Sequence, residues 1–103
     1  MKILFRSNSL RRDCNVLALA QKRWGSASAV IRRRLDDLDA AENLRQFLSL
    51  PHIKARTTAI VVHVQLTRIL EMILASRTRR GEANAFLESR VVVVDGIEET
   101  HGR

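Results

Sequence analysis

Two stretches in which apolar residues recur at helical spacing, separated by a Gly–Ser break, occupy the first half of this 103-residue chain. The first stretch runs from Leu10 to Trp24, and the second runs from Ala27 to Leu50, where Pro51 ends it. Gly25 suits the left-handed residue that closes many helices, so the pattern predicts a helical hairpin. Residues able to cap the two helices precede them: Ser7, Asn8 and Ser9 before the first, and Ser26 or Ser28 before the second.

Strand-like runs flank this hairpin. Residues 2–6 alternate and predict a first strand, and the β-branched runs 60–66 and 91–94 predict two more. Residues 66–75 fit either a helix or one face of a strand, and periodicity alone favours the helix. Residues 84–88 give no clear pattern. The mixture predicts one α+β domain that covers the whole chain.

The charge is strongly positive and is carried by arginine. The chain has 18 Lys and Arg against 11 Asp and Glu, a formal net charge of +7. Arginine presents a planar fork of donors that matches phosphate and stacks on bases, whereas lysine is a point charge. This bias favours a nucleic-acid ligand over an acidic protein partner. A GC-rich genome, whose codons favour arginine, is the other alternative.

Several features that the sequence lacks predict where the protein is located and whether it needs a cofactor. A lone cysteine, Cys14, cannot form an internal disulfide, no apolar run reaches the length of a membrane span, and the N-terminal run is too short for a signal peptide. We therefore expect a cytoplasmic protein. The histidines stand far apart and there is no glycine-rich phosphate loop, so we expect neither a metal site nor a cofactor.

Two cationic clusters are candidates for binding phosphate. Arg32 and Arg33 belong to an arginine triplet on the second helix, which can bind RNA or simply pair with the aspartates that follow at Asp36, Asp37 and Asp39. His52, Lys54 and Arg56 alternate, so in an extended segment all three would share one face. Such a face is either a phosphate clamp with a titratable histidine or an edge strand protected by charge.

The residues that form the hairpin resemble a known family. The resemblance lies in Cys14 within the first helix, the turn Lys22-Arg23-Trp24-Gly25, the run Ile31–Leu38, the segment Ala41–Arg45 and Leu50-Pro51-His52. These are similar to the RelE/ParE superfamily, and more closely to the HigB-like killer toxins of bacterial type II toxin–antitoxin systems. The likeness is good to about Lys54 and returns faintly over 91–102.

The resemblance implies a fold and an activity. The family packs a helical hairpin on a small twisted antiparallel sheet, which would make 68–75 a central strand, and we follow the resemblance there. Ribosome-dependent members cleave mRNA without a metal, using the ribose 2′-OH as the nucleophile. Carried over, the implied roles are general acid/base for His52, transition-state stabilisation for Arg68, assistance from His101, and phosphate binding by Lys54 and Arg56. A helix-turn-helix, HigA-like or acidic antitoxin would be the cognate partner, beside the ribosome and mRNA.

The chain also departs from the family. It contains no tyrosine, and Thr67 and Thr100 occupy places where the family commonly has one. Two alternatives therefore stay open: a catalytically impaired relic that binds RNA or antitoxin, and a ParE-like inhibitor of gyrase. The endonuclease interpretation further requires that His52, Lys54 and Arg68 converge in one shallow pocket.

Overall fold

The computed structural model describes residues 1–58, 60–77 and 83–100. The elements in chain order are β1 (Lys2–Phe5), α1 (Asn8–Asn15), α2 (Leu17–Trp24), the 3-10 turn η1 (Gly25–Ala27), α3 (Ser28–Ala40), α4 (Leu44–Leu48), β2 (Ala55–Thr58), β3 (Val61–Gln65), β4 (Leu70–Ala75), α5 (Ala83–Leu87) and β5 (Val91–Glu99). The prediction of an α+β fold is confirmed. Over these ranges, no helix combines the length and the apolar character that crossing a bilayer requires.

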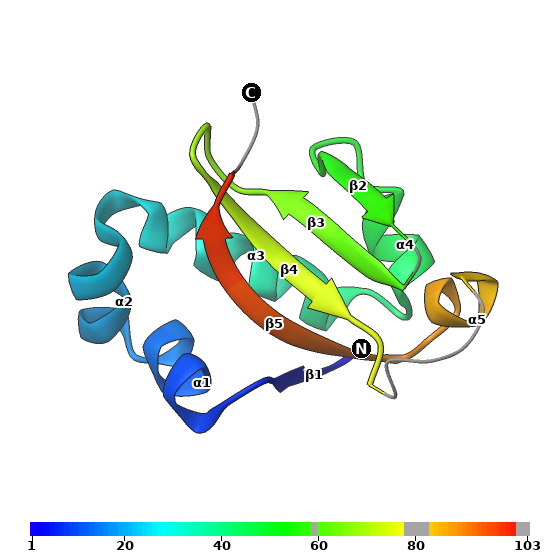
Figure 1. Ribbon diagram of the computed structural model, residues 1–103, viewed down its shortest axis with the longest axis horizontal. Coiled ribbons are helices and arrows are strands. Elements are labelled where there is room, and N and C mark those ends of the chain that lie inside the picture. Colours follow the sequence, from blue (N-terminus) through cyan, green and yellow to red (C-terminus); the bar gives the residue numbers. More distant parts are fainter. Residues whose placement is uncertain (59, 78–82, 101–103) are drawn as a thin grey trace.

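A five-stranded sheet in the order β1-β5-β4-β3-β2 forms one layer, and α3 and α4 lie behind it (Figure 1). The pairs β2·β3, β3·β4 and β4·β5 are antiparallel, but β1 and β5 are parallel. The sheet is therefore mixed, and the expectation of a purely antiparallel sheet is wrong. A parallel pair needs a crossover between its strands, and the helices between β1 and β5 contribute to it.

The hydrophobic core lies between the helices and one face of the sheet. Val62 and Val64 of β3 are fully buried there with Met72 and Leu74 of β4, against Leu35 of α3. Because side chains alternate along a strand, the residues between them point to the opposite face. We call this opposite face, which carries His63 of β3 and Glu71 of β4, the open face, since no described helix covers it in Figure 1.

The ambiguous stretch before Ala75 is a strand. β4 occupies residues 70–75 at the centre of the sheet, between β3 and β5. The central strand implied by the resemblance is thus confirmed from Leu70 onward, and the helical periodicity was misleading. A central strand is buried on both faces, so nearly every residue is apolar and no alternation remains to distinguish it from a helix.

The first predicted helix is divided in two. α1 ends at Val16, whose backbone is extended, and α2 begins at the next residue. Leu10 and Cys14 are buried as their spacing predicts, but Leu17 is 66% exposed, and Ala20 is the residue of α2 that becomes buried. The extended residue therefore resets the helical register, which apolar spacing alone could not indicate.

The second predicted helix also ends early. α3 stops at Ala40, and α4 starts after Asn43, whose side chain accepts a hydrogen bond from Gln46 N at 2.9 Å. The amino group of Met1 donates to carbonyl oxygens at the end of α3, including Asp39 O at 2.9 Å. A positive charge there complements the helix dipole and satisfies carbonyls that the helix leaves unpaired.

The capping predictions at the start of α1 and at the end of α2 are confirmed. Ser7 caps α1, because its Oγ accepts from Leu10 N at 3.1 Å, and Gly25 closes α2 with φ of 60°. Asn43 provides the start of α4. The expected cap from Ser26 or Ser28 is wrong, since η1 leads directly into α3 and no side chain caps it.

Replacing Gly25 by alanine tests this hairpin turn. The φ of 60° and ψ of −133° form a combination that side-chain-bearing residues rarely adopt, while a Cβ added there would contact nothing within 4 Å. We therefore expect Gly25→Ala to lower the free energy of unfolding by about 1–3 kcal/mol through backbone strain alone. Urea unfolding measures this, with the exposed Ser26→Ala as the control; equal stability of the two variants would contradict the strain.

Candidate functional site

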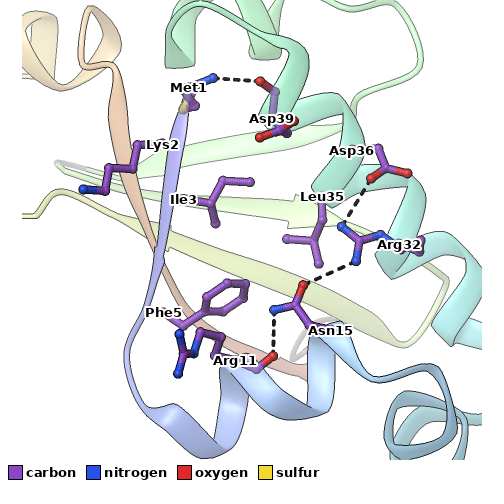
Figure 2. A pocket seen from close by; sticks show the side chains of 10 residues that line it. All are labelled: Met1, Lys2, Ile3, Phe5, Arg11, Asn15, Arg32, Leu35, Asp36 and Asp39. Atoms are coloured by element: carbon purple, nitrogen blue, oxygen red, sulfur yellow. Dashed lines mark hydrogen bonds and ion pairs between the residues drawn. The ribbon is translucent and has the colours of Figure 1, made fainter.

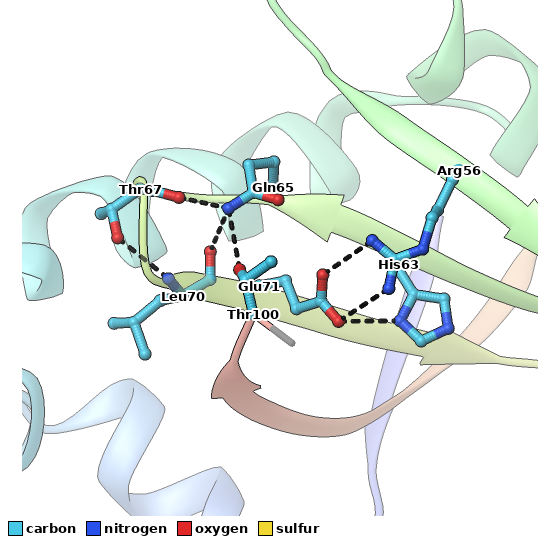
Figure 3. Close-up of polar contacts among 7 residues, drawn as sticks. All are labelled: Arg56, His63, Gln65, Thr67, Leu70, Glu71 and Thr100. Atoms are coloured by element: carbon cyan, nitrogen blue, oxygen red, sulfur yellow. Dashed lines mark hydrogen bonds and ion pairs between the residues drawn. The ribbon is translucent and has the colours of Figure 1, made fainter. Parts of the chain in front are cut away.

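A buried carboxylate on the open face organises the polar side chains of three strands. Glu71 of β4 is only 3% exposed. Arg56 of β2 donates to both of its oxygens, Nη1 to Oε2 at 3.0 Å and Nη2 to Oε1 at 3.2 Å. His63 of β3 lies 3.0 Å from Oε1 through Nδ1 (Figure 3). Since a carboxylate only accepts, Nδ1 is the donor, and the opposite ring nitrogen Nε2 is left for a ligand.

Strand register brings these residues together. Arg56 lies directly across from His63 in the β2·β3 pair, and Gln65 lies across from Glu71 in the β3·β4 pair. Directly opposed residues share one face of the sheet, so all four side chains project from the open face. The cluster therefore depends on two antiparallel registers at once.

The environment of Glu71 favours its charged form. Burial is the largest single effect and by itself would raise the pKa of this carboxyl. The hydrogen bonds from Arg56 and His63, together with the positive charge of their side chains, outweigh it, and the net result is a pKa lowered from the ordinary 4.5. Glu71 is therefore a fixed anion at neutral pH.

An open hollow of about 280 Å³ lies beside this cluster, lined by Lys54, Ala55, Arg56, His63 and Gln65. We call it the β2–β3 hollow. Lys54 precedes β2, and its carbonyl accepts from Gln65 N at 2.8 Å, which places it at the end of β3. Among the described residues Lys54 has no ion-pair partner. The hollow therefore offers an ammonium, a guanidinium and an imidazole to one anion.

His52 belongs to a different place. It lies in the turn after α4, so the expectation that it shares a strand face with Lys54 and Arg56 is wrong. Its Nε2 is 2.9 Å from Asp37 Oδ2, an oxygen that Arg34 also binds at 2.6 Å. His52 lines a separate hollow of about 320 Å³ over the end of α3, with Asp37 and Leu50 among its neighbours.

Arg68 lies in the turn between β3 and β4, before the strand begins. It lines a third hollow of about 490 Å³, beside Trp24 and Ile69. His52, Lys54 and Arg68 thus line three different hollows, and their expected convergence in one pocket is wrong. His101 lies outside the described residues.

The arginines of α3 are on the other side of the sheet from Glu71. Arg32 pairs with Asp36 at 3.2 Å and reaches Asn15 at 3.5 Å, in the hollow between β1, α1 and α3 (Figure 2). Arg33 is exposed and has no ion pair within the described part of the chain. Because α3 covers the core face, neither arginine can join Arg56 in the β2–β3 hollow.

Sequence reasoning missed His63, Glu71 and Gln65 as site residues. The signal for Glu71 was available, since it is the one carboxylate within the apolar run of β4, and a buried charge requires partners. His63 and Arg56 are the cations that alternation places on the adjacent strands. Gln65 carried no comparable signal, because a half-buried glutamine at the end of a strand is common.

The thiol of Cys14 and a metal site are two further possible sources of catalytic chemistry. Cys14 is 4% exposed, and burial raises the pKa of its thiol to about 11, so the thiolate needed for nucleophilic attack is scarce at neutral pH. In the three described ranges, no three His, Cys, Asp or Glu side chains are grouped so that they could hold a metal ion.

With this geometry in hand, the chain was compared with known protein families, with curated proteins and with solved structures. None of the three comparisons found a match.

Removing Arg56 tests whether this cluster is a structural unit. Arg56→Ala would leave the buried Glu71 carboxylate with His63 as its remaining partner, and a poorly compensated buried charge is costly. We expect the free energy of unfolding at pH 7 to fall by about 1–3 kcal/mol. The control Arg68→Ala removes an exposed arginine that has no ion pair among the described residues, and should change it by less than about 0.5 kcal/mol. Indistinguishable urea midpoints would contradict the cluster.

The lowered pKa of Glu71 makes a prediction about acid stability. Folding favours the carboxylate, so its stabilising contribution is present above pH 4.5 and is lost as the pH falls through the lower folded-state pKa. Glu71→Gln removes this titration. The free energy of unfolding of the variant, followed by urea titration from pH 7 to pH 3, should fall less steeply below pH 4.5 than that of the unmodified protein. Parallel curves would show that Glu71 does not titrate as inferred.

Proposed function

We propose that this chain is a metal-independent endoribonuclease of the RelE/ParE type, the toxin of a bacterial toxin–antitoxin pair, and that the β2–β3 hollow is its phosphodiester site. The observation that carries the proposal is the pairing of His63 and Arg56 with one buried carboxylate beside the unpaired Lys54. A helical layer on one face of a twisted sheet, with cations on the other, also agrees with the resemblance of the hairpin residues.

The proposed chemistry needs only groups that the chain itself supplies. The ribose 2′-oxygen attacks the adjacent phosphorus, the bond to the 5′-oxygen breaks, and a 2′,3′-cyclic phosphate and a 5′-hydroxyl result. His63, held through Nδ1, presents Nε2 to take the proton from the 2′-OH, and the imidazolium formed returns that proton to the leaving 5′-oxygen. Lys54 and Arg56 would stabilise the negative charge that develops on the phosphate.

Arg56 can bind Glu71 and a phosphate at the same time. A guanidinium has five donors, and the carboxylate uses two of them. The side chain of Arg56 is 53% exposed, whereas that of Glu71 is 4% exposed. Glu71 therefore acts as a positioning residue that fixes the Arg56 guanidinium and the His63 ring, while Arg56 also lines the hollow.

This proposal moves the acid/base role from His52 to His63. The Nε2 of His52 is already bound to Asp37, and among the described residues no lysine or arginine lines its hollow. His63 shares its hollow with two cations. Arg68 lies near the same end of the sheet as Lys54 but lines a different hollow. It would bind another phosphate of the same RNA, away from the one that is cleaved.

The proposed partner is an antitoxin that neutralises the cations. The net charge of +7 favours an acidic surface on that partner, as do the exposed Lys54, Arg33 and Arg68, which have no ion pair within the part of the chain that the structure describes. A helix-turn-helix protein that carries such a surface would block the β2–β3 hollow and leave the toxin inactive.

Cleavage by variants on programmed ribosomes tests the proposal. Purified protein, first dialysed against EDTA, is mixed with mRNA-bound ribosomes in magnesium buffer, and 5′ ends are mapped. We expect cleavage that leaves a 5′-hydroxyl, lowered by about 10²- to 10⁴-fold in His63→Asn, since a positioned acid/base supplies a factor of that size. Asparagine can still donate to Glu71, and His52→Asn is the matched control.

Other results would point elsewhere. Equal cleavage by both histidine variants would contradict the assigned site. Intact mRNA with retained, salt-sensitive RNA binding would favour the relic that binds without cutting. Intact mRNA with inhibited DNA supercoiling would favour a gyrase inhibitor.

A further inference from the structure

Gln65 has an amide group whose orientation is fixed by its surroundings. Its Nε2 donates to the carbonyl oxygen of Thr67, to Leu70 O at 3.3 Å and to Thr100 Oγ1 at 2.9 Å (Figure 3). Two of these partners are backbone carbonyls, which can only accept. Rotating the amide by 180° would place its oxygen against both of them, so the nitrogen must face the turn between β3 and β4.

The amide oxygen, Oε1, is consequently left over. It has no hydrogen bond within the described residues, and no buried side-chain oxygen or nitrogen there lacks a partner, so Oε1 reaches solvent. Gln65 lines the β2–β3 hollow with Lys54, Arg56 and His63. The hollow therefore combines two permanent cations and an imidazole with one rigid, neutral acceptor.

This acceptor does not suit a phosphate. A phosphodiester carries acceptor oxygens only, so it matches Lys54 and Arg56 and gains nothing from Oε1. The groups of a nucleotide that can donate, and that lie close to its phosphate, are the ribose 2′-OH and the N–H groups of the base. The hydrogen bonds of Nε2 already fix the side chain, so Oε1 loses little conformational entropy when such a donor binds.

We propose that Gln65 is a specificity-determining residue of the β2–β3 hollow, and that its Oε1 accepts a hydrogen bond from a donor of the nucleotide whose phosphate Lys54 and Arg56 bind. The inference rests on the proposed nucleic-acid site, but it concerns recognition and does not require cleavage. The two polar atoms of the Gln65 amide therefore have different roles. Nε2 stabilises the turn between β3 and β4, and Oε1 recognises the ligand.

Paired probes in a binding assay test this inference. Fluorescence anisotropy measures the affinity of full-length protein for labelled RNA and for DNA of the same sequence, and a gel confirms that each probe is intact afterwards. A second pair of DNA probes contains adenine or purine, which lacks the 6-amino group. We expect the unmodified protein to prefer the donor-containing member of one pair by about 3- to 10-fold, the range for one hydrogen bond. A preference within the RNA and DNA pair identifies the donor as the 2′-OH. A preference within the adenine and purine pair identifies it as the base amine.

The informative variant is Gln65→Lys. The ammonium group can still donate to Thr67 O, Leu70 O and Thr100 Oγ1, but it has no acceptor. Its added charge should raise the affinity for both members of a pair, so the readout is their ratio, which we expect to fall to about 1. Thr100→Val, which removes one partner of the nitrogen and leaves the oxygen, should keep the preference of the unmodified protein.

The outcomes separate this inference from the proposed function. A ratio unchanged in Gln65→Lys, or no preference in the unmodified protein for either pair, overturns the role of Gln65 even if mRNA is cut. A preference that disappears in Gln65→Lys supports it even if no cleavage occurs. Thermal unfolding of each variant verifies that the comparison is made between folded proteins.

Discussion

The charge of Glu71 is the constraint on which the open face depends. A carboxylate with 4% of its side-chain surface exposed has lost most of its hydration, and protein donors must replace it. Arg56 and His63 do so from the two strands that follow one another at this edge of the sheet. The requirement links β2, β3 and β4, because a shift of one residue in either register would turn a partner to the core face. Without that carboxylate, the Arg56 guanidinium and the His63 ring would face each other across neighbouring strands with no acceptor between them.

The same sheet can hold a polar cluster because its two faces are used differently. Val62 and Val64 bury one side of β3 against the helices, and His63, which lies between them, points to the other side. Only one helical layer is present in Figure 1, yet Ile73 and Ala75 of β4 are also buried on the face away from the helices, so that face is apolar at the centre of the sheet. Toward the β2 edge the same face carries charge, and there Lys54, from outside the strands, lies beside Arg56 in the β2–β3 hollow.

Much of the fold could be predicted from residue patterns, whereas of the residues that line the β2–β3 hollow only Lys54 and Arg56 were predicted as site residues. Apolar spacing and Ser7 located the helices, and β-branched runs located β3 and β5. The break at Val16 was not predicted because helical apolar spacing continues across it, from Cys14 to Leu17 and Ala18. The cluster depends on pairing between residues 56, 63 and 71, and the amide of Gln65 depends on Thr100, 35 positions away. A single sequence read in short windows contains neither relationship.

Two histidines are paired with carboxylates, and burial decides which pair can hold a ring rigidly. The side chains of His52 and Asp37 are 48% and 28% exposed, so water can replace either partner at little cost. The side chains of His63 and Glu71 are 23% and 4% exposed, and little water can reach that carboxylate when the ring moves away. Moving His63 would leave a buried anion with one partner fewer, which is a penalty that His52 does not face. Proton transfer requires a ring that stays aimed at its substrate, since small misplacements reduce rates steeply. Among the two, only the imidazole on β3 is restrained in this way, and it is also the one that lies beside cations able to hold a phosphate.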